Sequence, residues 1–360
     1  MSIHHTSTGE VSGARSPKHM GKWIFWFDEI GAETNDLVGK KCANLGEMTR
    51  LGMRVPYGFA ISVKGFEEFM NLTGLSQKVE ECIDNDRDNL KQIEVCQNVS
   101  RTVQDLVEKT PMPEVMRNEL AAHYKSLCER VGRKNIPVAV RSSGVISMPG
   151  QMDTYLNVIG EDAVVEHVRK VWASSYTTRA ITCRLEQDRP VEWSPIGVAV
   201  MMLVHAKSAG VVLTVLPTSG DTSKVVIEGN WGLGESVVSG EITPDSFVVE
   251  KDDLRITSRN IARKKGMVKR DERGTAYVPV PEELQDKPCL DDDEILEIAR
   301  TALRVEQHFG VPQDMEWVID RYLPFPENVF WVQARPARYT KANCAEDIDY
   351  IIDLMVQIFK

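Results

Sequence analysis

The sequence lacks three features that would place the protein in other classes. It has no long apolar run, because its longest, residues 196–204, is far shorter than the roughly 20 residues of a membrane-spanning helix. It has no basic excess: the net charge of -10 argues against general nucleic-acid binding, although a small-anion site needs only a few local cations. Its seven cysteines form no Cys-x-x-Cys pair, which indicates a reducing, cytoplasmic setting and disfavours a disulfide framework or a zinc ribbon.

What is present divides the chain into a leader, two lobes and a tail. With 360 residues, 42% of them hydrophobic and 27% charged, the chain is long enough for two or three lobes with buried cores. Residues 1–20 have no apolar core, so we expect a disordered leader and not a signal peptide. Residues 21–200 are predicted to form a first lobe, residues 201–340 a second lobe, and residues 341–360 an amphipathic helix.

Helical patterns dominate the first half and strand patterns dominate the second. Residues 64–130 are helical in pattern with a break at Pro111 and Pro113, and residues 161–186 are predicted to be one helix. Beyond residue 195, short strand-like runs alternate with glycine-rich loops, with one helix at 292–309. This mixture predicts an α+β fold and not a doubly wound parallel sheet.

Lys41 is the first candidate for a phosphate-binding side chain. It follows Gly39 at the start of a predicted helix, and a helix N-terminus attracts anions. The Gly-x-Lys spacing is not that of a Walker motif, which has four residues between its glycines. A solvated lysine without a partner is the alternative that the spacing leaves open.

Arg141 is the second candidate, because it ends a short buried-type strand and enters a loop rich in small residues. Gly144 and Gly150 in the loop that continues to Thr154 allow the backbone to approach an anion closely. An ordinary surface loop with an arginine salt bridge is the alternative. The glycine-rich segment that follows Glu228 is weaker, since a tight turn explains it equally well.

A hairpin-like pair near the end of the second lobe carries the most informative pattern. Residues i and i+2 of a strand share a face, so Asp314 lies beside Glu316, and Gln333 lies beside Arg335. Carboxylate, amide and guanidinium groups on adjacent strands predict a platform for Mg²⁺ and phosphate, unless this face simply lies in water. The residues predicted to face the core instead are Met315, Trp317, Val332 and Ala334.

Six motifs in this order resemble the ATP-binding domain of the phosphoenolpyruvate synthase and pyruvate phosphate dikinase family, from about residue 22 to residue 336. Lys40 and Cys42 replace small residues beside the motif lysine, so the local turn is expected to differ, and the loop after Arg141 is short, as in the dikinases. The matching segments are residues 39–48 (G-G-K-x-A-x-L-x-E-M in the family), 55–59 (V-P-P-G-F), 140–143 (V-R-S-S), 147–157 (the phosphate loop), 314–317 (D-x-E-[WF]) and 333–336 (Q-x-R-P).

The resemblance implies an ATP-grasp fold, in which two α+β lobes hold ATP between them. It implies that Lys41 and Arg141 contact the phosphates and that Arg335 lies on the transferring phosphate, which makes these three the catalytic candidates. It further implies the remaining ATP-binding and metal-binding residues: Gly150 and Thr154 in the phosphate loop, Glu228 near the adenine, and Glu316 and Gln333 as ligands of Mg²⁺.

The resemblance also predicts a partner that carries the phosphorylated histidine. In the family this histidine has a T-S-H context, which none of the seven histidines here has; His205 follows a strand but lacks it. We therefore expect a cytoplasmic phosphotransferase of the dikinase type, with paired acceptors, that phosphorylates or pyrophosphorylates a histidine on another subunit and releases AMP and phosphate. The small-molecule acceptor would act on that partner.

A stand-alone domain of this kind resembles the ATP-binding subunit of phenylphosphate synthase, which suggests phenol as the final acceptor. Three alternatives stay open: a domain of a phosphoenolpyruvate synthase-like or rifampin phosphotransferase-like enzyme, a nucleotide sensor without catalysis, and a kinase that transfers phosphate directly to a small hydroxyl compound. The apolar stripe of residues 341–360 would dock the partner, or pack on its own domain; its members are Ile348, Ile351, Ile352, Met355 and Phe359.

Overall fold

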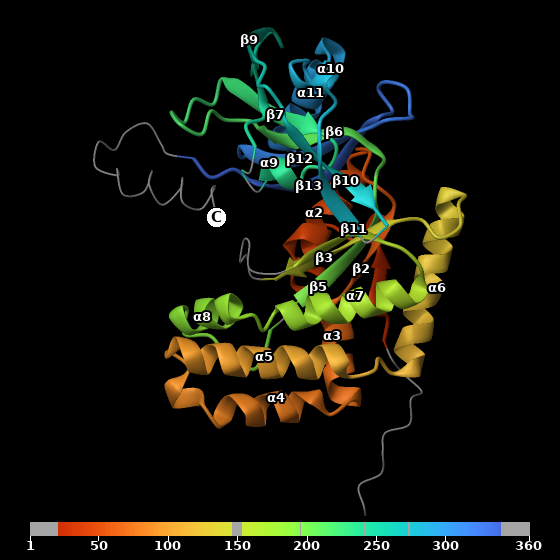
Figure 1. Ribbon diagram of the computed structural model, residues 1–360, viewed down its shortest axis with the longest axis vertical. Helices are drawn as coiled ribbons and strands as arrows, with labels where there is room; N and C mark the ends of the chain where they lie inside the picture. The colour runs from red at the N-terminus through yellow and green to blue at the C-terminus, as the bar shows by residue number, and fades with distance from the viewer. Residues whose placement is uncertain are drawn as a thin grey trace, which may run out of the picture.

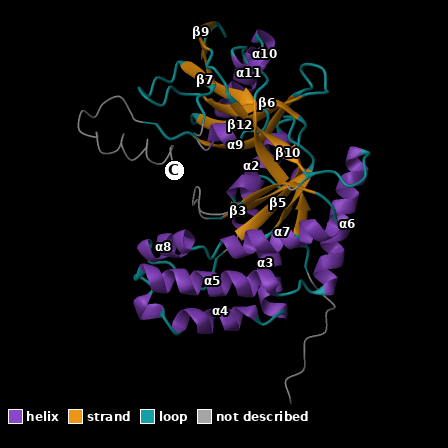
Figure 2. Cartoon of the chain, viewed as in Figure 1, coloured by secondary structure: helices purple, strands orange, loops and turns teal. Residues whose placement is uncertain are grey.

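Two antiparallel sheets, each covered by helices on its outer side, form the framework of the protein (Figure 1). The computed structural model describes residues 21–145, 153–194, 196–238, 240, 242–272 and 274–339. The predicted leader and the predicted C-terminal helix lie outside these residues. The mixture of helix and sheet confirms the predicted α+β class (Figure 2).

The first sheet has the order β1-β2-β5-β3-β4. Its strands are β1 (Ile24–Trp26), β2 (Gly58–Ile61), β3 (Val138–Gly144), β4 (Thr154–Val158) and β5 (Ile196–Met202). The helices beneath it in Figure 1 are α3 (Val63–Leu72), α4 (Leu75–Asp84), α5 (Ile93–Lys109), α7 (Glu161–Ser174) and α8 (Thr178–Glu186), and α6 (Glu114–Val131) stands beside it. They share one apolar core with the sheet, in which Phe69 stacks on Trp172 with ring centroids 5.0 Å apart.

The prediction of one helix over residues 161–186 was wrong. The chain leaves the helical conformation after Ser174, and Thr177 begins α8 as its N-cap, with its side-chain oxygen accepting a hydrogen bond from the backbone N–H of Ala180. Periodicity continues through this break because α7 and α8 bury apolar faces against the same core.

The second sheet has the order β13-β12-β6-β7-β8-β9. Its strands are β6 (Ala206–Leu213), β7 (Lys224–Trp231), β8 (Asp245–Glu250), β9 (Ile256–Asn260), β12 (Gln313–Asp320) and β13 (Val329–Pro336). The short helices α9 (Glu235–Val238) and α10 (Glu282–Gln285) lie in its connections. The outer face is covered by α11 (Asp292–Phe309), which starts at a reciprocal capping box between Asp291 and Glu294.

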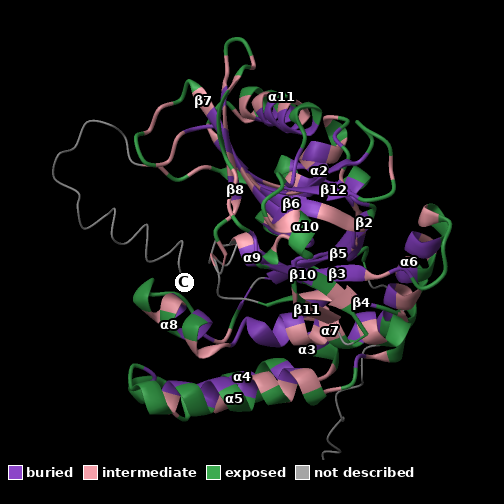
Figure 3. Ribbon diagram, turned by 45° about the horizontal axis from the view of Figure 1, so that its top comes forward, coloured by how far each residue is buried: buried purple, intermediate pink, exposed green. Residues whose placement is uncertain are grey.

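Two helices and a hairpin join the sheets. The helices α1 (Asn35–Val38) and α2 (Lys40–Arg50) precede β2 in sequence, yet buried side chains of α2 belong to the apolar core of the second sheet. A hairpin of β10 (Gly266–Asp271) and β11 (Gly274–Pro279) reaches from the second half to β4, where Asn157 donates a 2.7 Å hydrogen bond to the carbonyl of Asp271. One cluster of buried side chains joins α2 to strands of both sheets (Figure 3).

The predicted boundary between residues 200 and 201 falls inside β5, two residues before that strand ends at Met202. The connector to the second sheet is residues 203–205, ahead of β6. No helix in the described part of the chain is both long and apolar enough to span a bilayer.

Candidate functional site

A row of side chains crosses the second sheet on one face. Glu228 of β7 pairs with Val211 of β6, which pairs with Glu316 of β12, which in turn pairs with Gln333 of β13. Directly opposite residues of neighbouring strands point to the same side, so the row places two carboxylates and an amide on one surface. The hairpin prediction for Glu316 and Gln333 is confirmed in register, and their side chains touch: Gln333 Nε2 donates to Glu316 Oε1 at 2.7 Å.

Arg141 reaches this row from the first sheet. Its Nη2 donates to Gln333 Oε1 at 2.6 Å, and its Nη1 lies 3.8 Å from Glu316 Oε2. The Arg141 side chain is only 11% exposed, so this contact is shielded from solvent. Its buried Nε has no hydrogen-bond partner among the described residues. Arg141 pairs with Thr154 of β4, so the first residue of β4 lies next to Arg141.

A β-bulge in β13 provides the second contact of Arg141. The register shifts between Glu316 and Trp317, which leaves Val332 as the extra residue on β13 and sets Trp331 opposite Trp317. The carbonyl of Val332 accepts a 3.2 Å hydrogen bond from Arg141 Nη1. Val332 had been predicted to face the core; it is only partly buried, and Trp331 takes that place beside Trp317.

The free edge of β13 is covered by groups from the first half of the chain. Asn44 of α2 donates to the carbonyl of Ala334 at 2.8 Å, and the backbone N–H of Trp331 donates to the carbonyl of Arg54 at 2.9 Å. An edge strand exposes unpaired backbone groups, and these bonds satisfy some of them. They fix the position of α2, and therefore of Lys41, relative to the row.

Lys41 occupies the second position of α2, as the sequence predicted. The N-cap Gly39 has φ 78° and ψ 159°, and the hydroxyl of Ser143 in β3 accepts a 3.0 Å hydrogen bond from the backbone N–H of Cys42. This bond ties the first turn of α2 to the strand that carries Arg141. Ser143 therefore has a structural role that its position in the motif did not reveal.

Charged groups of both halves of the chain act on Lys41 and shift its pKa. Burial is the largest cause that lowers the pKa of Lys41; the charges of Arg141 and Arg335 also lower it, Glu316 opposes them, and together these effects bring it to about 8. Lys41 and Arg141 thus lie near a single compensating carboxylate, Glu316, while Arg335 has its own partner in Asp314. An anion with several charges would favour the protonated form of Lys41.

Arg335 and Asp314 form the second pair of the hairpin. They lie opposite each other, and both Nε and Nη2 of Arg335 are 2.9 Å from Asp314 Oδ2. Arg335 is 52% exposed, so its guanidinium is accessible. Burial raises the pKa of Asp314, against the effect of Arg335.

The structure thus brings together five of the predicted site residues: Lys41, Arg141, Glu316, Gln333 and Arg335. Glu228 lies in the same row, half-buried, and desolvation raises its pKa. Thr154 is exposed beside Arg141. Gly150 lies outside the described residues.

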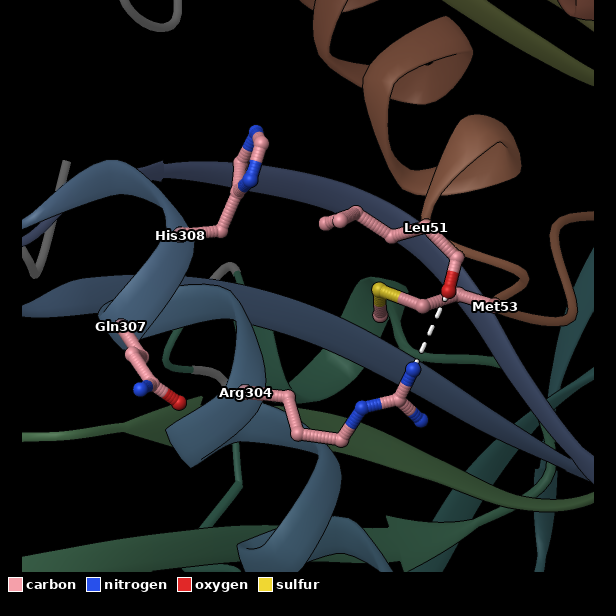
Figure 4. Close-up of a pocket in the computed structure, with 5 residues that line it drawn as sticks. All are labelled: Leu51, Met53, Arg304, Gln307 and His308. Atoms are coloured by element: carbon pink, nitrogen blue, oxygen red, sulfur yellow. Dashed lines mark hydrogen bonds between the residues drawn. The ribbon is translucent and has the colours of Figure 1, made fainter.

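His205 belongs to a different region. It lies in the connector between β5 and β6, and its ring contacts Arg133 and Arg270, neither of which is part of the row. A pocket between α2 and α11 is also separate and contains none of the predicted site residues (Figure 4). In it, Arg304 of α11 points toward the end of α2 and donates to the carbonyl of Leu51 at 3.0 Å.

Comparison with known proteins identifies relatives over almost the whole described chain. Residues 35–353 match the family model described as pyruvate phosphate dikinase, AMP/ATP-binding domain. A probable phosphoenolpyruvate synthase of Staphylothermus marinus is 40% identical over 343 residues, which cover 87% of this chain and 41% of the relative. One from Methanocaldococcus jannaschii is 39% identical over 336 residues, covering 90% and 27%. The phosphoenolpyruvate synthase of Aeropyrum pernix is 37% identical over 348 residues, covering 87% and 42%. The chain spans less than half the length of each of these relatives.

Proposed function

The chain belongs to the family of pyruvate phosphate dikinase AMP/ATP-binding domains. We propose that it binds ATP between its two sheets, in an ATP-grasp arrangement, and that a phosphoryl or pyrophosphoryl group of this ATP is transferred to a histidine. The observation that supports this most directly is the convergence of Lys41 and Arg141 from the first half with Arg335 from the second. Three cations around one polar row are suited to a triphosphate, whose negative charge they would neutralise.

Each cation has a distinct part in the proposal. Lys41 and Arg141 hold the phosphates from the side of the first sheet, and the lowered pKa of Lys41 makes its charge sensitive to the arrival of an anion. Arg335 lies at the end of β13 and is exposed, so it is suited to the phosphate that is transferred. Thr154 is beside Arg141 in register and continues the phosphate contacts.

Glu316 and Gln333 fit a magnesium site in part. They offer one carboxylate and one amide oxygen on adjacent strands, and no cluster of three or more His, Cys, Asp or Glu that could hold a metal is found among the described residues. Mg²⁺ with two protein ligands would take its other ligands from water and phosphate oxygens, as is usual for nucleotide sites. When bound, the ion would neutralise phosphate charge.

In the proposed reaction the histidine nitrogen bonds to the β-phosphorus of ATP. The bond from that phosphorus to the oxygen shared with the α-phosphate breaks, so AMP leaves and the histidine carries a pyrophosphoryl group, which hydrolysis converts to phosphohistidine and phosphate. The role of this chain is to position the triphosphate and balance its charge. The histidine lies outside the described residues, on a partner subunit or on a further part of a longer polypeptide.

The relatives favour one acceptor over another. The relatives described above are one phosphoenolpyruvate synthase and two probable ones, which supports a pyruvate-directed enzyme, the alternative from the sequence, more than phenol as the acceptor. We therefore propose that the phosphohistidine made with this chain serves the interconversion of pyruvate and phosphoenolpyruvate.

The test is transfer of label from ATP labelled at the β-phosphate to a histidine-bearing protein domain. We expect acid-labile label on that domain, AMP as the nucleotide product, and loss of both with Arg335→Lys, which keeps the charge but not the planar fork. Arg101→Gln is the matched control, because it removes an exposed arginine of α5 far from the row in sequence and fold. ADP as the product would contradict the dikinase mechanism, and ATP binding without any transfer would favour a sensor.

A further inference from the structure

Three basic side chains meet where the two halves of the chain join. Arg133 follows α6 of the first half, His205 lies in the connector between the sheets, and Arg270 lies on β10 of the hairpin that reaches across. Arg133 Nη1 is 3.2 Å from His205 Nε2, and Arg270 Nη2 is 2.5 Å from His205 Nδ1. One imidazole thus lies between two guanidinium groups.

The protons in this arrangement do not match. A guanidinium only donates, and a neutral imidazole has one accepting nitrogen and one N–H group. Only one of the two contacts is therefore a hydrogen bond, and in the other an N–H faces an N–H. Protonation of His205 would make both contacts repulsive. The pKa of His205 is lowered by burial first and by the charges of Arg270 and Arg133 as well, while Asp320 opposes them.

The nearby carboxylate does not resolve this mismatch. Asp320 is occupied by backbone donors: its Oδ2 accepts from the N–H of His205, and its Oδ1 accepts from the N–H groups of Tyr322 and Leu323. Among the described residues, neither Arg133 nor Arg270 has a carboxylate oxygen within the 4.0 Å of an ion pair. This is notable in a chain whose net charge is -10.

The cluster is also open to solvent on one side. Arg133 is exposed, and the ring of Tyr322, which is 72% exposed, stands edge-on to the imidazole with centroids 5.4 Å apart. A small solute can therefore reach guanidinium N–H groups that lack an acceptor.

We propose that Arg133, His205 and Arg270 form a binding site for a small multivalent oxyanion of the phosphate and sulfate class, separate from the row that is suited to ATP. Oxygen atoms of such an anion accept from both guanidinium groups and turn the donor–donor contact into two hydrogen bonds. The added negative charge allows His205 to take up a proton and donate as well. Because the three residues come from both halves and their connector, binding ties the halves together at this point.

The test is the protonation of His205, followed by NMR of its labelled imidazole and assigned with His205→Asn. Sulfate is the probe because it does not titrate near neutral pH, and sodium chloride at equal ionic strength is the control for screening. We expect sulfate to raise the pKa of His205 by about one unit, which corresponds to about tenfold tighter binding to the protonated form. Loss of the shift is expected in the double variant Arg133→Gln, Arg270→Gln.

Two further variants keep the test decisive. Lys269→Gln removes a neighbouring exposed charge of β10 and should leave the shift unchanged. Arg133→Gln alone changes only an exposed side chain, and should reduce the shift even if the double variant does not fold. The proposal is overturned if millimolar sulfate leaves the pKa of His205 where chloride leaves it, or if the shift persists in the folded arginine variants.

Discussion

The contact between Gly39 and Ser143 gives a direct test of how the row and the cations are held together. A Cβ built on Gly39 would lie 1.9 Å from the carbonyl oxygen of Ser143, about 1.5 Å short of the 3.4 Å at which ordinary contact begins. The neighbour is backbone and cannot rotate away, so Gly39→Ala has to separate α2 from β3. The two catalytic candidates Lys41 and Arg141 lie on these two elements.

The expected magnitude has two parts. The conformation of Gly39, with φ 78° and ψ 159°, is open almost only to glycine and costs about 1–3 kcal/mol for another residue. Overlap with packed neighbours adds about 1–3 kcal/mol. A displacement of this size between catalytic groups is expected to reduce histidine phosphorylation about 10²-fold.

Gly52→Ala is the matched control. Gly52 also has a positive φ, of 72°, but a Cβ there meets nothing within 4 Å, so the substitution costs only backbone strain of about 1–2 kcal/mol. Urea unfolding measures the free-energy difference between the two variants, and label transfer from ATP measures activity. Equal destabilisation by both substitutions, or full activity of Gly39→Ala, would refute the role of this contact in positioning Lys41 and Arg141.

Four other outcomes follow from the site. ATP affinity should fall as the pH rises through about 8, where Lys41 loses its charge, and Lys41→Gln should remove this step in a calorimetric titration. The free energy of unfolding of the ligand-free protein should rise between about pH 8 and pH 10.5, because in this range the unfolded chain keeps the Lys41 proton that the folded chain has released. Arg335→Ala should abolish histidine phosphorylation while the circular dichroism spectrum stays unchanged; retained transfer would refute its role. Asn44→Ala should cost about 1 kcal/mol in urea unfolding by removing the bond to the carbonyl of Ala334.

Local patterns were enough to predict the hairpin and the start of α2. The alternation that places Glu316 beside Asp314 is a property of any extended strand, and it survives in the observed register with Gln333 and Arg335. The N-terminal position of Lys41 follows from a glycine before a helical run. The resemblance to a family then linked segments that lie almost 300 residues apart.

What the sequence could not reveal depends on contacts between distant segments. The cap of Ser143 on α2 joins residues 101 positions apart, and the bulge at Val332 is recognisable only from the pairing of β13 with β12. The hairpin of β10 and β11 also escaped prediction, because most of its residues are exposed or only partly buried and its strands show no clear apolar alternation. The proximity of His205 to Arg133 and Arg270 likewise needs both halves and the connector in place.

If ATP binds as proposed, the hydrogen bonds of Gln333 imply that the row rearranges. Its amide oxygen accepts from Arg141, and its amide nitrogen donates to Glu316. A magnesium ion bound to the same oxygen would lie next to the guanidinium of Arg141, and because two cations repel each other, we expect Arg141 to exchange that acceptor for a phosphate oxygen. The 3.2 Å bond from Arg141 to the carbonyl of Val332 does not compete with this exchange, because it uses Nη1, a different nitrogen. The bulge can therefore hold the guanidinium in position while its other nitrogen changes partner.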